Sequence, residues 1–266
     1  MRRPEDHNIQ GTNFMATETD TALYESFDSG HGTLNHIWGG GQIDRSTPGE
    51  VTLSGTVGMM EFPGGQDAGH GYGTYTVNAK LDGNGPGPAI LLWPGDDNWP
   101  GQEIDMAEVL NDGRQYGTVH WDGGGWDGYE SRIFDGVNGG EFHDYTVVWE
   151  PDQITFKVDG VEKGVITENV PRDYDHGGMN NAISLMNNSP DTSLTVRDVS
   201  YTPLGGDAPD QTATGDTGDT SAPEDQGTGN APQEEIAAPA GDGPVDWDAL
   251  AAQVMANYEA TGSWYM

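Results

Sequence analysis

The chain has 266 residues, no cysteine, and a formal net charge of −34 that comes from 44 acidic residues against 10 Lys and Arg. This balance argues against nucleic-acid binding, which needs basic side chains to neutralise phosphates, and against binding to anionic membranes. The absence of cysteine excludes a disulfide framework and catalysis by a thiol.

Residues 1–20 are polar, and we predict that they form a flexible N-terminal arm. The chain begins Met-Arg-Arg, but no apolar stretch follows, so we expect no cleavable secretory signal. The longest apolar runs, such as residues 89–93, are far shorter than the roughly 20 residues that a membrane-spanning helix needs. The sequence therefore predicts a protein with no membrane segment.

Residues 21–204 alternate short β-rich runs with turns rich in Gly and Asp, and no long helix is evident among them. This pattern is typical of an all-β sandwich made of two antiparallel sheets. Two of the runs flank Pro151-Asp152 and predict a β-hairpin. The clearest predicted strands cover residues 73–81, 115–121, 145–150, 154–158 and 194–201.

Residues 103–108 read Glu-Ile-Asp-Met-Ala-Glu, which places three acids in an apolar, strand-like run. Alternate side chains of a strand share a face, so Glu103 and Asp105 point the same way. In a regular strand Glu108 would point to the opposite face, but one extra residue in a β-bulge near Met106 and Ala107 would bring it back. We therefore predict a bulge at this point and three acids on one face.

Two carboxylates that flank a glycosidic bond are sufficient to cleave it, one as nucleophile and the other as general acid and then base. In such a site Asp105 is a like-charged neighbour that helps to keep the acid protonated and orients the nucleophile. The alternative is a solvated acidic strand face in a protein that is acidic throughout. The spacing alone favours neither interpretation.

The sequence around the acids resembles glycoside hydrolase family 16, the laminarinase and lichenase group. The hallmark of that family is Glu-x-Asp-x-x-Glu in a bulged form, or Glu-x-Asp-x-Glu without the bulge. The resemblance covers residues 20–204 and rests on segments that follow the family's order, namely Gly71-Tyr72-Gly73-Thr74-Tyr75, Ala79-Lys80-Leu81, Ala89-Ile90-Leu91-Leu92-Trp93-Pro94, Asn98-Trp99-Pro100-Gly101-Gln102, Thr118-Val119-His120-Trp121, Phe142-His143-Asp144-Tyr145 and residues 154–160.

The resemblance implies a concanavalin-like jelly roll with a catalytic cleft on the concave face of the sandwich. It also implies that Glu103 is the nucleophile, Asp105 the supporting acid and Glu108 the acid/base of a retaining endo-glycosidase. The expected substrate is a β-linked polysaccharide, β-1,3- or mixed β-1,3/1,4-glucan. An uncharged glycan is also the polymer most compatible with the net charge of the chain.

Several positions depart from the family pattern. Gln102 stands where the family usually has Gly, while Thr76 and Asn78 stand where many relatives have Glu and Arg. Residues 183–188 lack the usual Asn-Leu-Ala-Val-Gly-Gly ending. These departures affect the identity of the substrate more than the chemistry.

Sugar rings present apolar C–H faces, so their binding sites combine aromatic platforms with polar groups that contact hydroxyls. By the resemblance, His120 faces the cleft, where it can hydrogen-bond Asp105 or the sugar. A tryptophan within a regular apolar run, such as Trp149, is predicted to be a core residue. The predicted substrate-binding residues are Trp93, Trp99, His120, Trp121, Trp126, Asn78 and Asn35.

No His/Cys cluster indicates zinc or a redox metal, and we expect no cofactor. Relatives often hold a structural calcium with an acid near the last strand, where this chain reads Val196-Arg197-Asp198. Arg197 takes the expected position, or Asp198 supplies the acid one place later, and a shift of one residue reverses the face. The sequence therefore does not support calcium binding.

Residues 205–243 are rich in Gly, Asp, Thr, Pro and Ala, which predicts a disordered acidic linker. Residues 244–266 form a predicted C-terminal tail with a short amphipathic helix, in which Asp246 is a plausible N-cap and Trp247, Leu250, Val254 and Tyr258 share one face. Three interpretations of this helix remain open: it is an uncleaved export signal, it docks a partner, or it has no role.

The leading hypothesis is thus a retaining glycoside hydrolase. A transglycosylase that uses the same site and a non-catalytic glycan-binding sandwich are the alternatives. A binding module has no need of all three acids, which favours an enzyme. We expect a monomer that acts on polysaccharide outside the cell, exported without a cleavable signal, with a cytoplasmic location as the alternative.

Overall fold

The computed structural model describes residues 21–209 of the chain. Within these residues the secondary structure is β except for one 3₁₀ turn, η1 (Tyr174–His176), so the predicted all-β class is confirmed. No helix in this range is long and apolar enough to cross a membrane. The predicted N-terminal arm, the linker from residue 210 onward and the C-terminal tail lie outside the described residues.

The strands follow one another in the order β1 (Leu23–Glu25), β2 (His36–Gly39), β3 (Gln42–Asp44), β4 (Val51–Met60), β5 (Gly73–Asp82), β6 (Pro88–Pro94), β7 (Glu103–Val109), β8 (Gln115–Asp122), β9 (Asp127–Phe134), β10 (His143–Glu150), β11 (Gln153–Val158), β12 (Val161–Ile166) and β13 (Asn181–Pro203). The five strands expected most clearly from the sequence correspond to β5, β8, β10, β11 and the second part of β13.

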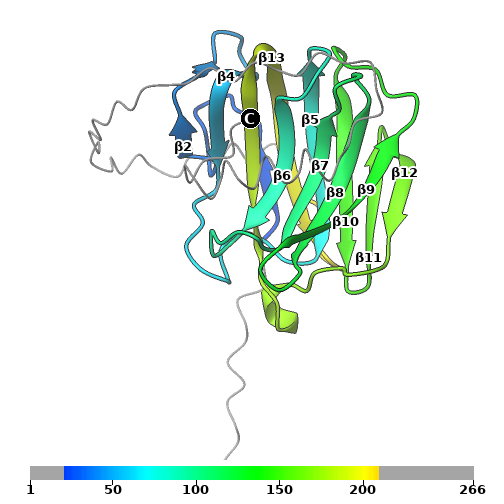
Figure 1. Ribbon diagram of the computed structural model, residues 1–266. Coiled ribbons are helices and arrows are strands. Elements are labelled where there is room, and N and C mark those ends of the chain that lie inside the picture. The colour runs from blue at the N-terminus through cyan, green and yellow to red at the C-terminus, as the bar shows by residue number, and fades with distance from the viewer. Residues whose placement is uncertain (1–20, 210–266) are drawn as a thin grey trace, which may run out of the picture. The chain divides into compact units, whose positions relative to one another are not determined.

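The long strand β13 joins the two layers of the sandwich. Residues 181–187 of β13 pair with β6, whereas residues 193–203 pair with β5, and β4 pairs with both parts. One antiparallel sheet therefore folds over on itself as a jelly roll, and its two layers are the two predicted sheets (Figure 1). We call the layer with β2, β6, β7, β8 and β9 layer A, and the layer with β5, β10, β11 and β12 layer B.

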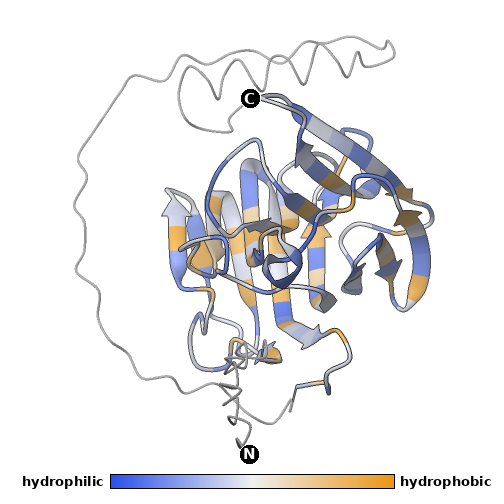
Figure 2. Ribbon diagram, turned by 90° about the horizontal axis from the view of Figure 1, so that it is seen from below, coloured by the Kyte–Doolittle hydropathy of each residue, from blue (hydrophilic) through white to orange (hydrophobic). Residues whose placement is uncertain are grey.

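The core lies between these layers because apolar and polar residues alternate along the strands (Figure 2). In β5, Val77 and Leu81 are buried in the core, while Thr76 and Lys80 lie on the opposite, outward face of the strand. Each such aliphatic side chain contributes about 1.5–3 kcal/mol when it leaves water. Trp149 is fully buried, as predicted.

The hairpins of layer B follow from short turns. Strands β10 and β11 pair from Tyr145 opposite Val158 to Glu150 opposite Gln153, which confirms the predicted hairpin around Pro151-Asp152. The next turn uses Asp159 and Gly160, whose φ angles are 51° and 74°. Positive φ at both central positions is what a two-residue hairpin turn of type I′ requires.

A β-bulge lies in β13 at Arg197, where the pairing with β5 shifts between Val196 and Asp198. Asp198 consequently lies opposite Asn78 and faces outward, although it comes one place later than the family pattern expects. From the sequence we expected an acid at position 198, in place of 197, to point to the opposite face of the strand. This expectation is wrong, because the bulge adds one residue to β13 and so leaves Asp198 on the outward face. Arg197 itself projects outward, 3.6 Å above the ring of Phe142.

Candidate active site

The three acids lie on β7, in the middle of layer A between β6 and β8. Glu103 pairs with His120 and Asp105 with Thr118, after which Glu108 pairs with Tyr116. Three steps along β7 thus match two steps along β8, so the extra residue lies at Met106-Ala107. The predicted bulge is confirmed.

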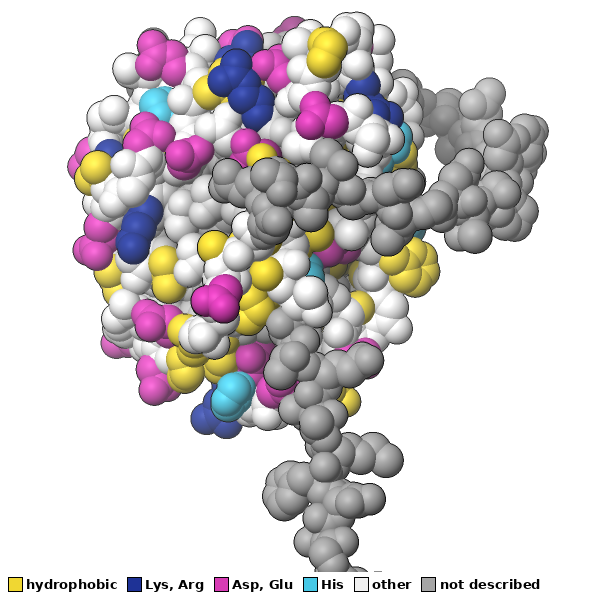
Figure 3. Space-filling view, turned by 180° about the vertical axis from the view of Figure 1, so that it is seen from behind, with side chains coloured by type: hydrophobic (Ala, Val, Ile, Leu, Met, Phe, Trp, Pro, Cys, Tyr) yellow, Lys and Arg dark blue, Asp and Glu magenta, His cyan; other side chains and the backbone are white. Residues whose placement is uncertain are grey.

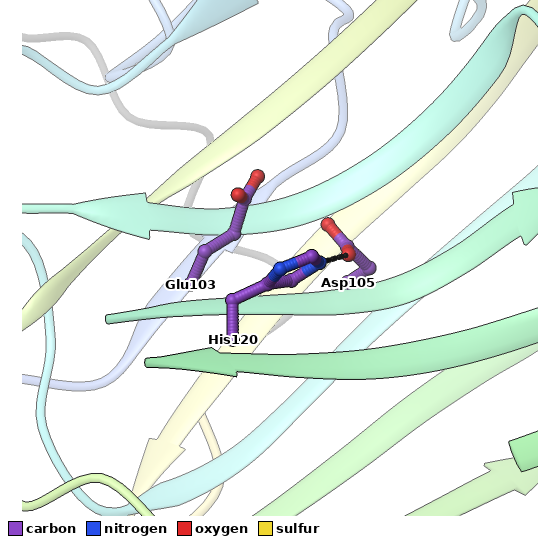
Figure 4. A group of neighbouring side chains, drawn as sticks. All are labelled: Glu103, Asp105 and His120. Atoms are coloured by element: carbon purple, nitrogen blue, oxygen red, sulfur yellow. Dashed lines mark hydrogen bonds and ion pairs between the residues drawn. The ribbon is translucent and has the colours of Figure 1, made fainter. Parts of the chain in front are cut away.

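The bulge separates the acids from the core. Ile104 and Ala107 are fully buried between the layers, whereas Glu103, Asp105 and Glu108 emerge on the outer face of layer A. Figure 4 shows the side chains of Glu103 and Asp105 rising to the same side of β7 as His120 does from β8. Glu103 and Asp105 are only 7% and 3% exposed, so both carboxyls are largely removed from water.

His120 bridges two carboxylates. Its Nε2 lies 3.0 Å from Oδ2 of Asp105, and its Nδ1 lies 2.9 Å from Oδ1 of Asp127. A carboxylate accepts hydrogen bonds, so an imidazolium, which donates from both ring nitrogens, fits this position between two carboxyl groups. Burial alone would lower the pKa of His120, but the hydrogen bonds to Asp105 and Asp127 outweigh it and raise that pKa well above its ordinary value.

The two glutamates are harder to ionise than ordinary glutamates. Burial, followed by the nearby charge of Asp105, raises the pKa of Glu108 to about 8. The same two causes raise the pKa of Glu103, while the positive charge of His120 opposes the rise. Oxygen atoms of Glu103 and Asp105 and a ring nitrogen of His120 lie within 4.8 Å of one another. At neutral pH Glu108 therefore carries a proton that it can donate.

Tyr116 is a site residue that the sequence reasoning missed. Its hydroxyl hydrogen-bonds Glu108, and Glu108 also hydrogen-bonds Asp105. Burial and the charge of Glu108 raise the pKa of the Tyr116 phenol, so this group keeps its proton. Tyr116 alternates with Thr118 and His120 along the predicted strand, so counting back from His120 by twos would have found it.

Within residues 21–209 the one group of three or more acids and histidines close enough to share an ion is Glu103, Asp105 and His120. Both ring nitrogens of His120 lie within hydrogen-bond distance of a carboxyl group, that of Asp105 at Nε2 and that of Asp127 at Nδ1. The cluster is arranged for proton transfer and charge stabilisation.

A family model described as "Glycosyl hydrolases family 16" matches residues 35–201. The chain belongs to glycosyl hydrolase family 16. The resemblance noted in the sequence is thereby confirmed, and so is the class of enzyme, a glycoside hydrolase.

Solved structures agree with the fold of this family 16 chain. A Bacillus licheniformis beta-glucanase is 21% identical, with a TM-score of 0.51, over 70% of this chain and 100% of its own. A native glycosidic hydrolase is 22% identical, with a TM-score of 0.51, over 72% of this chain and 100% of its own. No curated protein matches the chain.

Two of the predicted tryptophans of this family 16 enzyme lie beside the acids. Trp93 and Trp99 stack with ring centroids 5.8 Å apart and planes at 11°. The ring of Trp99 is 5.2 Å from that of His120, and the indole N–H of Trp93 donates to Asp97 at 2.7 Å. This stacked pair forms an aromatic surface beside the acids.

Trp121 and Trp126 lie further away. Trp121 follows His120 and so points to the other side of β8, where its ring packs over Gly128. It lines a cavity of about 520 Å³ at the ends of the strands, together with Gln102 and Asp122. Trp126 is 57% exposed in the β8–β9 turn, with its ring over Gly123. The structure does not bring either ring against the acids.

Gln102 shows what one departure from the family pattern does. Its side-chain amide donates to the backbone oxygen of Met179 and, at 2.8 Å, to Oδ1 of Asn181. Asn181 in turn donates to the backbone oxygens of Leu92 and Gln102. The side chain that replaces glycine therefore ties the start of β7 to the start of β13.

The two predicted asparagines do not join the site. Asn78 lies on the outer face of layer B, where its amide donates to Asp144 at 2.6 Å. The prediction that Asn78 contacts the substrate is wrong, because β5 belongs to the layer opposite the acids. Asn35 is exposed just before β2, and β4, β13 and β6 separate β2 from β7.

Aromatic residues extend across the outer face of layer A on both sides of the acids. Trp38 on β2 packs over Gly58, where an added Cβ would lie 2.2 Å from the indole ring. Tyr129 on β9 is 47% exposed, and its ring lies 5.9 Å from that of His120. Seven adjacent strands from β2 to β9 span about 30 Å at ordinary strand spacing. This face is long enough for several sugar units.

Proposed function

We propose that this enzyme is a retaining endo-glycosidase of β-linked polysaccharide, with β-1,3- or mixed β-1,3/1,4-glucan as its substrate. The observation that carries the proposal is the bulge in β7, which brings Glu103, Asp105 and Glu108 to one face. The pKa of Glu108, raised to about 8, supplies the protonated acid that the first step requires.

In the first step Glu103 attacks the anomeric carbon while Glu108 gives its proton to the departing glycosidic oxygen. The carbon–oxygen bond to the leaving sugar breaks as the bond to Glu103 forms. The imidazolium of His120 favours the ionised form of Glu103, as its lowering effect on the Glu103 pKa indicates. Asp105 holds His120 on one side and Glu108 on the other.

In the second step Glu108 is a carboxylate and takes a proton from water. The water oxygen attacks the anomeric carbon, and the bond to Glu103 breaks, which restores both carboxyl groups. Two displacements on opposite sides of the same carbon leave the configuration of the product unchanged. The sugar leaves as the β anomer.

Action within a chain is supported by the position of the acids. Trp38 and Tyr129 lie toward opposite edges of layer A, with β7 between them, so a polymer has aromatic surface on either side of the acids.

Acidic side chains outnumber Lys and Arg on the face in Figure 3, in keeping with the net charge of −34. This charge disfavours anionic polymers and favours an uncharged glucan.

The test is to incubate the protein with laminarin, lichenan and agarose and to follow the reducing ends by proton NMR. We expect short oligosaccharides from laminarin or lichenan, with the β anomer formed first. An initial α anomer would rule out retention, and cleavage of agarose alone would rule out the glucan. Products longer than the starting chains would show transfer to a sugar hydroxyl in place of water.

A further inference from the structure

Asp127 is a partly buried acid beside the site, and the reaction above gives it no role. It is the first residue of β9, and its Oδ1 lies 2.9 Å from Nδ1 of His120. Asp105 contacts the opposite nitrogen of the same ring at 3.0 Å. The side chains of Asp127, His120 and Asp105 are 18%, 16% and 4% exposed, so this contact is screened from most water.

The β8–β9 turn holds Asp127 in place. Asp127 pairs with Asp122, and Oδ1 of Asp122 accepts hydrogen bonds from the backbone N–H groups of Gly124 and Gly125 at 2.8 and 2.7 Å. Both glycines have φ near 90°, a conformation that side chains rarely adopt. The turn therefore fixes the register that puts Asp127 and His120 on the same face.

Groups from three sides surround the ring of His120. Strand β7 contributes the carboxyls of Glu103 and Asp105, β9 contributes Asp127 and the phenol of Tyr129, and the ring of Trp99 lies 5.2 Å away. If Nδ1 lost its proton, its lone pair would face the carboxylate of Asp127. Loss of the proton from Nε2 would set its lone pair against the carboxylate of Asp105 in the same way, so both repulsions are avoided while the ring keeps both N–H groups.

We propose that Asp127 is a positioning residue for the reaction of Glu103 and Glu108, which holds His120 doubly protonated and aimed at Asp105. The catalytic consequence rests on the proposed function, whereas the contact itself does not. A hydrogen-bonded chain then runs from Asp127 through His120 and Asp105 to Glu108, across β9, β8 and β7. Through it, Asp127 keeps a positive charge next to the nucleophile.

The first test is Asp127→Asn, which keeps the size of the side chain and an acceptor oxygen but removes the charge. We expect kcat to fall about a hundredfold with little change in KM, because the supporting ring is no longer held in place. The high-pH limb of the kcat profile moves to lower pH, since His120 now loses its proton at lower pH. Asp127→Glu restores part of kcat.

The matched control is Asp135→Asn. Asp135 is exposed and directly follows β9, so the variant makes the same charge change without touching His120. We expect its kcat and pH profile to equal those of the unchanged protein. A role of Asp127 in folding alone would lower kcat of Asp127→Asn equally at every pH, and that result overturns the proposal.

The second test needs no substrate. Proton NMR of the imidazole C–H groups reports the charge of each histidine, and His120→Gln identifies the resonance of His120. We expect His120 to be charged at neutral pH and to lose its proton at a lower pH in Asp127→Asn than in the unchanged protein. A neutral His120 at pH 7 in the unchanged protein overturns the proposal, even if Asp127→Asn fails to fold.

The two tests separate the two proposals. If no glycan is cleaved but His120 titrates as expected, the proposed function fails and the role of Asp127 in holding the ring stands. If glucan is cleaved and neither the pH profile nor the titration changes in Asp127→Asn, the proposed function stands and the role of Asp127 is disproved.

Discussion

The two outer faces of the sandwich both carry acids, yet only one of them forms a catalytic site. On layer B, Asp144 is exposed and accepts a hydrogen bond from Asn78, and Asp198 lies opposite Asn78 with Arg197 beside it. On layer A, Glu103 and Asp105 are nearly inaccessible to water, and the cation beside them is His120.

The comparison shows that burial, more than the presence of acids, makes a carboxyl reactive. Burial, with help from Asp144, raises the pKa of Asp198 too, but the charge of Arg197 opposes the rise. On layer A the same cause acts on a cluster of three carboxyls and takes the pKa of Glu108 to about 8. Burial removes the layer A acids from water and so disfavours their charged forms, and this loss of solvation keeps protonated the group that catalysis needs.

The largest expected effect comes from Glu103→Gln. The amide has nearly the same size but is not a nucleophile, so we expect turnover to fall by about 10⁴-fold or more while the fold and glycan binding persist. The measurement is release of reducing sugar from laminarin or lichenan. Asp144→Asn makes the same kind of change on layer B and should leave turnover unaltered. Substantial activity in Glu103→Gln would refute its role as nucleophile.

Deletion of Ala107 tests the bulge itself. The motif then reads Glu-Ile-Asp-Met-Glu, and in a regular strand the last Glu keeps its face and its pairing opposite Tyr116. We expect a folded protein whose turnover is lower by about a hundredfold, because the acids shift by about 1 Å. Circular dichroism and the same glucan assay provide the measurements.

The control deletes both Met106 and Ala107. The last Glu then falls one place after Asp105 and points into the core, where an unpaired charge is costly. We expect this variant to lose activity and most of its stability. Equal behaviour of the two deletions would contradict the argument from strand faces.

The sequence was sufficient to predict the bulge because of the residues around it. The core takes up the apolar side chains of Ile104, Met106 and Val109, while the three acids must stay on the outer face. One extra residue in β7 meets both requirements, and a regular strand does not. Tyr116 was within reach by the same counting. Asp127 was not, since its contact with His120 depends on the register of β9 against β8, which the Gly-rich turn sets.

The misplaced residues show the limit of patterns that span single strands. Alternation assigns Asn78 to the polar face of its strand, which is correct, but does not say to which layer the strand belongs. In β13 the pair Arg197-Asp198 separates the buried Val196 from the buried Val199 and so breaks the period of two, but only the pairing with β5 shows that a bulge absorbs the extra residue. Layer and register are set by contacts between distant segments.

A smaller effect is expected from Tyr116→Phe on the pH profile. Catalysis needs protonated Glu108, so kcat is lost as pH rises through about 8. The hydrogen bond from Tyr116 lowers the pKa of Glu108, so its removal raises that pKa and moves the high-pH limb to higher pH. Tyr129→Phe, which removes a phenol from β9 beside His120, is the control. A shift to lower pH in Tyr116→Phe would contradict the assignment of Glu108 as the acid.

The smallest expected effect concerns stability, and it compares the two faces directly. Because the pKa of Glu108 is raised, its contribution to stability is fully present below the pKa of the unfolded chain and is lost as pH rises to about 8. Glu108→Gln removes this loss, so we expect it to stabilise the protein by on the order of 2 kcal/mol at pH 8 and by little at pH 5. The half-buried side chain is partly screened by water, which keeps the gain below that of the full shift.

Urea unfolding at the two pH values measures this difference. Asp144→Asn on layer B is the counterpart, since its exposed carboxyl has given up little solvation, and its stability should change by less than about 0.5 kcal/mol at either pH. A carboxyl of layer A thus lowers the stability of the folded protein at the pH where it can act, and a carboxyl of layer B does not. If Glu108→Gln proves no more stable than the unchanged protein at pH 8, burial is not what raises the pKa of Glu108, and the contrast between the two faces needs another cause.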